Sequence, residues 1–156
     1  MRDSVATSLA VSIKELPAVH VAYIDCKVDF AQGDFSNEIR QCFQRVQTWV
    51  RELGYDPYTL LTIGVIQTVD SRRAVYTCCV QIPGEVQSGS DGVGIRELLG
   101  GRYAVVSIKK EPAIIGDSIS RFYQEYAPQN NIEIDGTRPT YEIYYESTVE
   151  YCVPIR

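Results

Sequence analysis

A glutamate and a tyrosine near the end of the chain have the residue types and the spacing to bind a positively charged molecule. Glu142 and Tyr144 lie two residues apart in a predicted β-strand over 140–145, so both side chains point to one face. If that face is buried, the carboxylate needs a partner, because an unpaired charge loses its solvation. A cationic ligand supplies one. If Ile143 faces the core instead, Glu142 faces solvent.

Aromatic rings suited to surround a cation are mostly tyrosines in this chain, which has eleven Tyr against four Phe and one Trp. Each ring face attracts a cation by about 0.5–2 kcal/mol, and a tyrosine hydroxyl also donates to a carboxylate. Strand alternation and helical periodicity select as candidate ligand-binding residues Tyr23, Trp49, Tyr76, Tyr103, Phe122, Tyr126 and Tyr144. Trp49 and Phe122 fall on the apolar stripes of the two helices, which favours core positions that border the pocket. Tyr76, with Tyr141 and Tyr145, also fits ordinary cross-strand pairs.

Other reactive side chains predict neither a metal site nor a cofactor, and no catalytic residue is assigned. The five cysteines lack a C-x-x-C pair, which argues against a zinc site or a disulfide framework and favours a reducing cytosol. His20, the single histidine, is expected to be structural. The glycines at 89–94 lack the following Lys-Ser/Thr of a phosphate-binding loop. This segment is better suited to a mobile lid.

The elements that must position these residues follow from hydrophobic periodicity. Strands are predicted at 8–15, from 19 onward, at 59–69, 73–82, 103–109, 140–145 and 149–155. Apolar residues at three- and four-residue steps predict a helix of about five turns from 35 to 53, capped by Asp34 or Ser36 and ended by Gly54. A second helix is expected to start at Pro112 and to stop at Pro128.

The two halves of the chain share one order of elements: strand, helix, strand, strand. We predict a single α+β domain over 1–156 with two pseudo-repeats, about 8–83 and 100–156, joined by a Gly/Ser-rich loop at 84–99. Side by side, these units form a twisted, mainly antiparallel sheet with both helices on one face. The seam between the units is the expected ligand cleft.

Composition and charge exclude several classes of protein. The 45% hydrophobic content is near the globular average, so neither disorder nor a fibrous repeat fits. A net charge of −5 opposes direct nucleic-acid binding. The sequence has no apolar run long enough for a membrane span and no basic leader, which predicts a cytoplasmic protein without membrane contact. The oligomeric state stays open.

Several short motifs, taken in order, resemble the GyrI-like family, which includes the effector-binding domains of MerR- and AraC-type multidrug regulators. They are IKELPAV at 13–19, GGRYAV at 100–105, Ile115-Gly116 before Phe122-Tyr123, Arg138-Pro139 before Glu142 and Tyr144, and Glu150 before Pro154-Ile155. The resemblance spans nearly the whole chain and implies the duplicated fold derived above. It also implies a pocket for hydrophobic, often cationic molecules, with Glu142 as its carboxylate and Glu150 as a second acidic residue.

Three functions remain open. The first is a stand-alone protein that binds cationic or aromatic drugs or metabolites through Glu142 and the aromatic residues. The second is a hydrolase of strained, electrophilic cyclopropanoid natural products, since some relatives resemble such enzymes and a Glu/Tyr pair can activate water. The third is an interaction protein similar to inhibitors of DNA gyrase. A small-molecule ligand is the partner predicted by the first two.

Overall fold

The computed structural model describes residues 9–29 and 36–156, and the side chain of Ser36 is outside that description. Its strands are β1 Ala10–Leu16, β2 Val19–Asp29, β3 Thr62–Thr68, β4 Arg73–Gln81, β5 Gly94–Leu98, β6 Gly101–Lys109, β7 Thr140–Tyr144 and β8 Thr148–Pro154. Its helices are α1 Ser36–Glu52, the 3₁₀ turn η3 Pro57–Thr59, α2 Pro112–Arg121, the π-helical turn η4 Phe122–Tyr126 and α3 Ala127–Gln129. No helix within these residues combines the length and apolarity needed to cross a bilayer.

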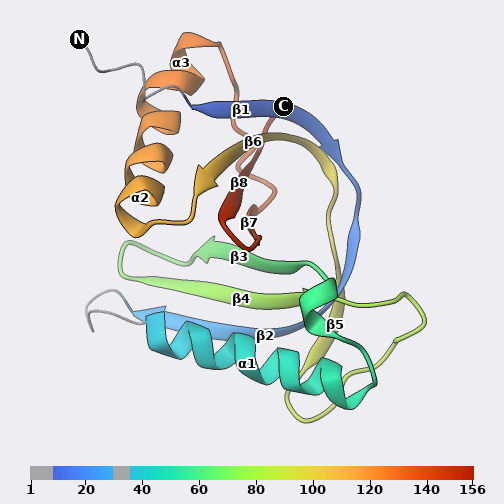
Figure 1. Cartoon of the computed structure of the whole chain (residues 1–156). Coiled ribbons are helices and arrows are strands. Elements are labelled where there is room, and N and C mark those ends of the chain that lie inside the picture. The colour runs from blue at the N-terminus through green and yellow to red at the C-terminus, as the bar shows by residue number, and fades with distance from the viewer. Residues whose placement is uncertain (1–8, 30–35) are drawn as a thin grey trace.

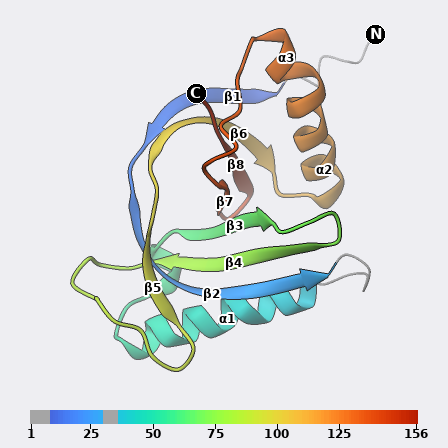
Figure 2. The same cartoon turned by 180° about the vertical axis from the view of Figure 1, so that it is seen from behind.

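The described strands form one antiparallel sheet in the order β1-β6-β8-β7-β3-β4-β2-β5 (Figure 1). Two units of the same plan, β2-α1-β3-β4 and β6-α2-β7-β8, meet where β3 pairs with β7. The predicted fold class, a duplicated β-α-β-β arrangement with a mainly antiparallel sheet, is therefore confirmed. Both views of the chain show β1 and β6 bending strongly along their length (Figure 2).

Helix α1 forms because its apolar residues fall on one side. Val46, Trp49 and Val50 are buried against β2 and β4, while the opposite side carries polar residues. Gly54 ends the helix, as predicted, with a positive φ of 97°. Its N–H donates to Arg51, and that of Tyr55 donates to Val50, which completes a Schellman motif. The predicted caps, Asp34 and the Ser36 side chain, lie outside the described residues.

The second helix starts at Pro112, as predicted, but it does not stop at Pro128. The chain widens into the π turn η4, and Pro128 then occupies the first turn of α3, where its missing N–H is not needed. The helical segment ends after Gln129, where Asn131 adopts a positive φ of 54°. The π turn brings Phe122, Tyr123 and Tyr126 close together, with ring centroids 5.4 and 5.9 Å from that of Phe122.

Part of the segment expected as a loop is a strand. Within 84–99, β5 pairs antiparallel with β2 from Val19↔Leu98 to Tyr23↔Gly94. Gly94 permits this pairing because a side chain there would lie within 2.7 Å of the Tyr23 ring. The glycine and serine content concealed the strand, whose main-chain pairing does not depend on large side chains.

Each face of the sheet carries its own core. Even-numbered residues of β2 and β6, such as Ala22 and Val106, face α1 and α2 respectively. The helix-free face carries a second cluster, made of Val21, Ile63, Val65, Cys79, Leu98, Tyr103, Val105, Tyr141, Ile143 and Cys152. These residues are at most 9% exposed although no helix covers them, so the curvature of the sheet encloses them. On the opposite, helix-bearing face, α1 and α2 leave the middle of the sheet uncovered.

Candidate functional site

Glu142 lies on the helix-bearing face of the sheet, midway between the two helices. One row of paired residues crosses the sheet from β2 to β6: Ile24, Cys78, Gly64, Glu142, Tyr151 and Val106. Ile24 contacts the α1 cluster, and Val106 contacts the α2 cluster. Since paired residues point to the same side, the whole row shares one face. Glu142 is half-buried there, while its neighbours Tyr141 and Ile143 are buried on the opposite face.

Two tyrosine hydroxyls hold the Glu142 carboxylate. Tyr76 on β4 donates to Oε1 at 2.7 Å, and Tyr144 on β7 donates to the same oxygen at 2.8 Å. The two hydroxyl oxygens also contact each other. The other carboxylate oxygen, Oε2, receives no hydrogen bond from any described residue, and none of the described lysines or arginines forms an ion pair with Glu142. The carboxylate is thus held by neutral donors and keeps one oxygen available.

Both phenols are expected to stay protonated in the folded protein. Burial raises the pKa of Tyr76 and Tyr144 well above the usual value for tyrosine, and the neighbouring charge of Glu142 raises it further. A protonated phenol is a hydrogen-bond donor, so both residues are fixed in the state that stabilises a carboxylate. Glu142 therefore has two neutral hydrogen-bond donors beside it.

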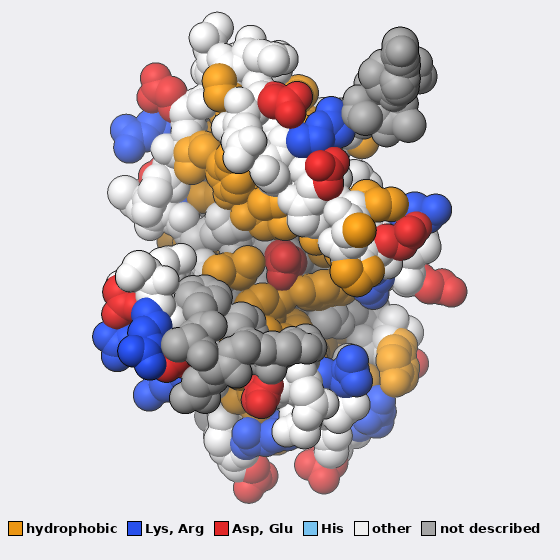
Figure 3. All heavy atoms as spheres, turned by 90° about the vertical axis from the view of Figure 1, so that its left-hand side faces the viewer, with side chains coloured by type: hydrophobic (Ala, Val, Ile, Leu, Met, Phe, Trp, Pro, Cys, Tyr) orange, Lys and Arg blue, Asp and Glu red, His pale blue; other side chains and the backbone are white. Residues whose placement is uncertain are grey.

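Phe43 of α1 packs edge-on against both tyrosines. Its ring centroid is 6.1 Å from that of Tyr76 and 5.8 Å from that of Tyr144, at interplanar angles of 77° and 80°. On the α2 side, Tyr151 pairs with Glu142 across β7 and β8, and its hydroxyl lies 3.0 Å from that of Tyr123. Aromatic residues therefore flank Glu142 on both sides. Seen from this side of the molecule, hydrophobic side chains surround an acidic one in a hollow (Figure 3).

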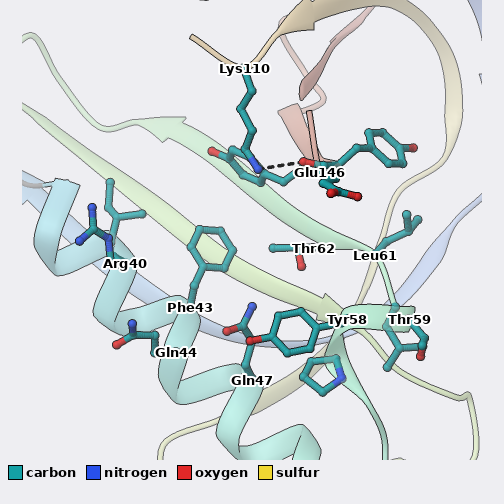
Figure 4. Close-up of a pocket in the computed structure, with 15 residues that line it drawn as sticks. Arg40, Phe43, Gln44, Gln47, Tyr58, Thr59, Leu61, Thr62, Lys110 and Glu146 are labelled. Atoms are coloured by element: carbon teal, nitrogen blue, oxygen red, sulfur yellow. Dashed lines mark hydrogen bonds between the residues drawn. The ribbon is translucent and has the colours of Figure 1, made fainter. Parts of the chain in front are cut away.

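A cavity of about 1030 Å³ opens beside this group, between α1, η3, the start of β3 and the β7–β8 turn (Figure 4). Its walls are Ile39, Arg40, Phe43, Gln44, Gln47, 57–62, Lys110 and 144–146. Glu142 is not itself in this wall, but Tyr144 is: its ring faces the cavity and its hydroxyl binds Glu142. Tyr144 thus lies between the cavity and the carboxylate, and Phe43 packs against it in the same wall. Volumes of this size accommodate drug-sized molecules.

The structure brings together three of the residues predicted for the site, Glu142, Tyr76 and Tyr144. It places Tyr23 and Tyr103 on the helix-free face. Tyr103 is fully buried, stacks on Tyr141 at 5.4 Å and donates to the Leu99 carbonyl. The guanidinium carbon of Arg96 lies over the Tyr23 ring, 5.4 Å from the ring centroid.

The remaining aromatic candidates belong to the helix cores. Trp49 is 6% exposed and donates from its indole N–H to the Ser90 hydroxyl at 3.0 Å. Phe122 is fully buried among residues of β6 and β8, and Tyr126 stacks on it. These rings support the two helices that border the hollow, at positions away from Glu142.

Glu150 lies on the opposite face from Glu142. It pairs with Ile143, whose side chain is on the helix-free side, and accepts a hydrogen bond from the exposed Tyr145 hydroxyl at 3.1 Å. The two carboxylates therefore do not share a pocket. Among the described residues, no three His, Cys, Asp or Glu side chains come close enough together to hold a metal ion.

Sequence reasoning missed Phe43, Tyr151 and Lys110. Phe43 follows Ile39 by four residues, so it lies on the same edge of α1. Tyr151 lies two residues from each of the buried Val149 and Val153, so it shares their face of β8, the helix-bearing one. Lys110 follows the end of β6, and its place over the cavity depends on the β7–β8 turn. Only the first two carried a signal in the sequence.

The fold is thus an α+β domain, a curved antiparallel sheet with two helices on one face and a partly aromatic cavity beside α1. Residues 9–156 match the GyrI-like small molecule binding domain, and the chain belongs to this family. No curated protein matches the chain.

Solved structures share the fold at low sequence identity. SAV2435 bound to tetraphenylphosphonium has a TM-score of 0.69 and 14% identity over 94% of each chain. The C-terminal domain of EcmrR has a TM-score of 0.69 and 14% identity over 95% of this chain and 98% of its own. A hydrolase from Listeria innocua has a TM-score of 0.66 and 11% identity over 94% and 91%. These likenesses establish the fold.

Proposed function

We propose that this protein binds hydrophobic cations and cationic aromatic small molecules, with Glu142 as the counter-charge. The observation that carries the proposal is a half-buried carboxylate held on one oxygen by two neutral phenols and paired with no described cation. Partial burial weakens the hydration of Glu142, and the two hydroxyls offset only part of that loss. A positively charged ligand next to Oε2 offsets the rest of this lost hydration.

The surroundings of Glu142 favour a cation with an apolar body. Phe43, Tyr76 and Tyr144 present ring surfaces beside the carboxylate, and such faces attract cations. SAV2435, which shares the fold, is solved with tetraphenylphosphonium, a positive charge enclosed by phenyl groups. We propose that Glu142, Tyr76 and Tyr144 contact the ligand and that Tyr151 and Phe43 complete the walls.

In this arrangement Phe43 and Tyr144 act as movable walls of the site. The open cavity reaches Tyr144, so a ligand that enters it meets the ring before it meets the carboxylate. Turning the Phe43 or Tyr144 side chain aside joins the cavity to Oε2 of Glu142. Tyr76 then keeps its hydrogen bond to Oε1 and holds the carboxylate in place.

Isothermal titration with tetraphenylphosphonium tests the proposal. Glu142→Gln keeps the size of the side chain and its ability to accept from Tyr76 but removes the charge, so we expect about tenfold weaker binding, or roughly 1.4 kcal/mol. Glu150→Gln, the same change on the opposite face, is the matched control and is expected to bind like the wild type. Equal affinity of the Glu142→Gln variant and the wild type would contradict the proposal.

Hydrolysis is a second candidate, favoured by the free oxygen of Glu142. Oε2 is available to accept a proton from a water molecule, which then adds to an electrophilic carbon as a ring bond breaks and the ring atom leaves with the electron pair. The structural neighbour from Listeria innocua is described as a hydrolase. Incubation with a cyclopropane-containing alkylating compound, followed by mass spectrometry, should show a Glu142-dependent product that has gained one water. If the compound binds but is recovered unchanged, hydrolysis is rejected and ligand binding stands as the function.

A further inference from the structure

A lysine lies over the same tyrosine that holds Glu142. Lys110 follows β6, and its Nζ donates to the Tyr145 carbonyl oxygen at 2.8 Å (Figure 4). The same Nζ is 5.5 Å from the centroid of the Tyr144 ring. The hydroxyl of that ring binds Glu142 at 2.8 Å. One tyrosine side chain therefore separates a carboxylate from an ammonium group.

The ammonium of Lys110 is not neutralised by a carboxylate of the described residues. The neighbouring Lys109 pairs with Glu111 at 3.1 Å and turns away, whereas Lys110 has the Tyr145 carbonyl as its hydrogen-bond acceptor. Glu146 shares the cavity wall but forms no ion pair with Lys110. An ammonium has three donors, so two of those of Lys110 remain available to a ligand.

A second positive side chain faces the cavity from α1. Arg40 lies in the same wall as Phe43, is exposed, and has no ion pair with any described residue. A site that served monovalent cations alone would lose affinity through these like charges. Arg40 and Lys110 instead suit an anionic group, at the solvent side of a cavity whose inner end leads to a carboxylate.

We infer that the preferred ligands of the Glu142 site are amphoteric: molecules with a cationic group, an apolar or aromatic body, and a carboxylate or similar anion. The cation lies against Glu142, the body fills the aromatic cavity, and the anion pairs with Lys110 at the mouth, with Arg40 on the facing wall. This inference rests on the proposed function and specifies its ligand class. The volume of the cavity, about 1030 Å³, accommodates a body of several fused rings.

Rhodamine B and its ethyl ester test the inference, because they share one cationic xanthene body and differ in whether the carboxylate is free. Fluorescence anisotropy titrations compare the wild type with Lys110→Met, which keeps an unbranched side chain one atom shorter and removes the charge. We expect the wild type to bind the free acid more tightly. Lys110→Met should weaken binding of the free acid by about two- to fivefold, the size of an exposed ion pair, and leave the ester unchanged or bound more tightly.

Lys109→Met is the matched control, since Lys109 is adjacent, exposed and paired with Glu111. It should leave both affinities unchanged. If Lys110→Met shifts both dyes equally or neither, the inference is wrong, while weaker binding of the ester by Glu142→Gln would still support the proposed function. Failure of the wild type to bind either dye would count against both.

Discussion

Gly64 leaves the space through which Tyr76 reaches Glu142. Gly64 lies on β3, between Cys78 of β4 and Glu142 of β7 in the row of paired residues that crosses the sheet. A Cβ at position 64 would lie 2.6 Å from Cζ of Tyr76 and closer still to its hydroxyl oxygen. The Tyr76 ring therefore crosses β3 over a residue that has no side chain.

Gly64→Ala should displace Tyr76 and disrupt the hydrogen bond to Glu142. We expect a loss of about 1–3 kcal/mol in the free energy of unfolding, as for other overpacked positions, and weaker ligand binding. Urea denaturation and the tetraphenylphosphonium titration measure the two effects. Gly116→Ala is the control, since nothing lies within 4 Å of a Cβ there. Being inside α2, it should stabilise the protein by about 0.5–1 kcal/mol. Equal effects of both changes would argue against the role of Gly64.

Tyr76→Phe removes one of the two donors to Glu142 while keeping the ring against Phe43. The carboxylate is then held by Tyr144 alone, and we expect a loss of about 1–2 kcal/mol in the free energy of unfolding. Urea denaturation is the measurement. Tyr58→Phe provides the comparison, because Tyr58 is 79% exposed and its hydroxyl accepts only a hydrogen bond from Arg51. A loss as small as that of Tyr58→Phe would mean that the Tyr76 hydroxyl contributes little.

Stability should fall at alkaline pH because of the buried phenols. Burial raises the pKa of Tyr76, Tyr144 and Tyr151 in the folded protein, whereas the unfolded chain has the ordinary value near 10. The unfolded state therefore loses its phenolic protons first, and the free energy of unfolding should decrease as the pH rises above about 10. Tyr151→Phe should reduce this slope in denaturation curves measured from pH 9 to 11. A slope equal in Tyr151→Phe and the wild type would contradict the explanation.

The four buried cysteines, Cys26, Cys78, Cys79 and Cys152, should resist thiol reagents in the native protein. Burial raises the pKa of Cys26 to about 11, and that of Cys79 and Cys152 to about 12, so little thiolate forms at pH 8. Ellman's reagent with peptide mapping should therefore label the half-buried Cys42 first. All five cysteines should react in guanidinium chloride. Early labelling of Cys79 or Cys152 would show that the helix-free core opens more readily than its packing indicates.

The fold was predictable where a pattern depends on neighbouring residues. Periodicity placed α1 and Gly54, and the repeated order of elements gave the duplicated sheet. The pairing of β1 with β6 and of β5 with β2 joins segments far apart in the chain, and local patterns carry no information about such partners. For the same reason, β5 was hidden within a segment rich in glycine and serine.

The candidate site shows the same division. Alternation along β7 correctly put Glu142 and Tyr144 on one face, and burial of Ile143 opposite settles which face each side chain occupies. Deciding which other aromatic residues lie beside Glu142 required knowing how the neighbouring strands pair, residue by residue. Tyr103 and Tyr76 both lie within β-strands, yet on opposite faces of the sheet. Tyr76 shares a face with Cys78 beside α1, whereas Tyr103 shares the helix-free face with Val105.

The exchange of outer strands interlocks the two halves. The sole described partner of β1 is β6, and that of β5 is β2. The strand β1, which precedes the first half, therefore edges the second half. The strand β5, which precedes the second half, edges the first. A chain cut between β4 and β5 would yield two fragments that each hold a strand with its partner in the other fragment. Such fragments are expected to reassemble with each other rather than to fold singly. The walls of the hollow are thus tied together at the rims of the sheet as well as along its centre.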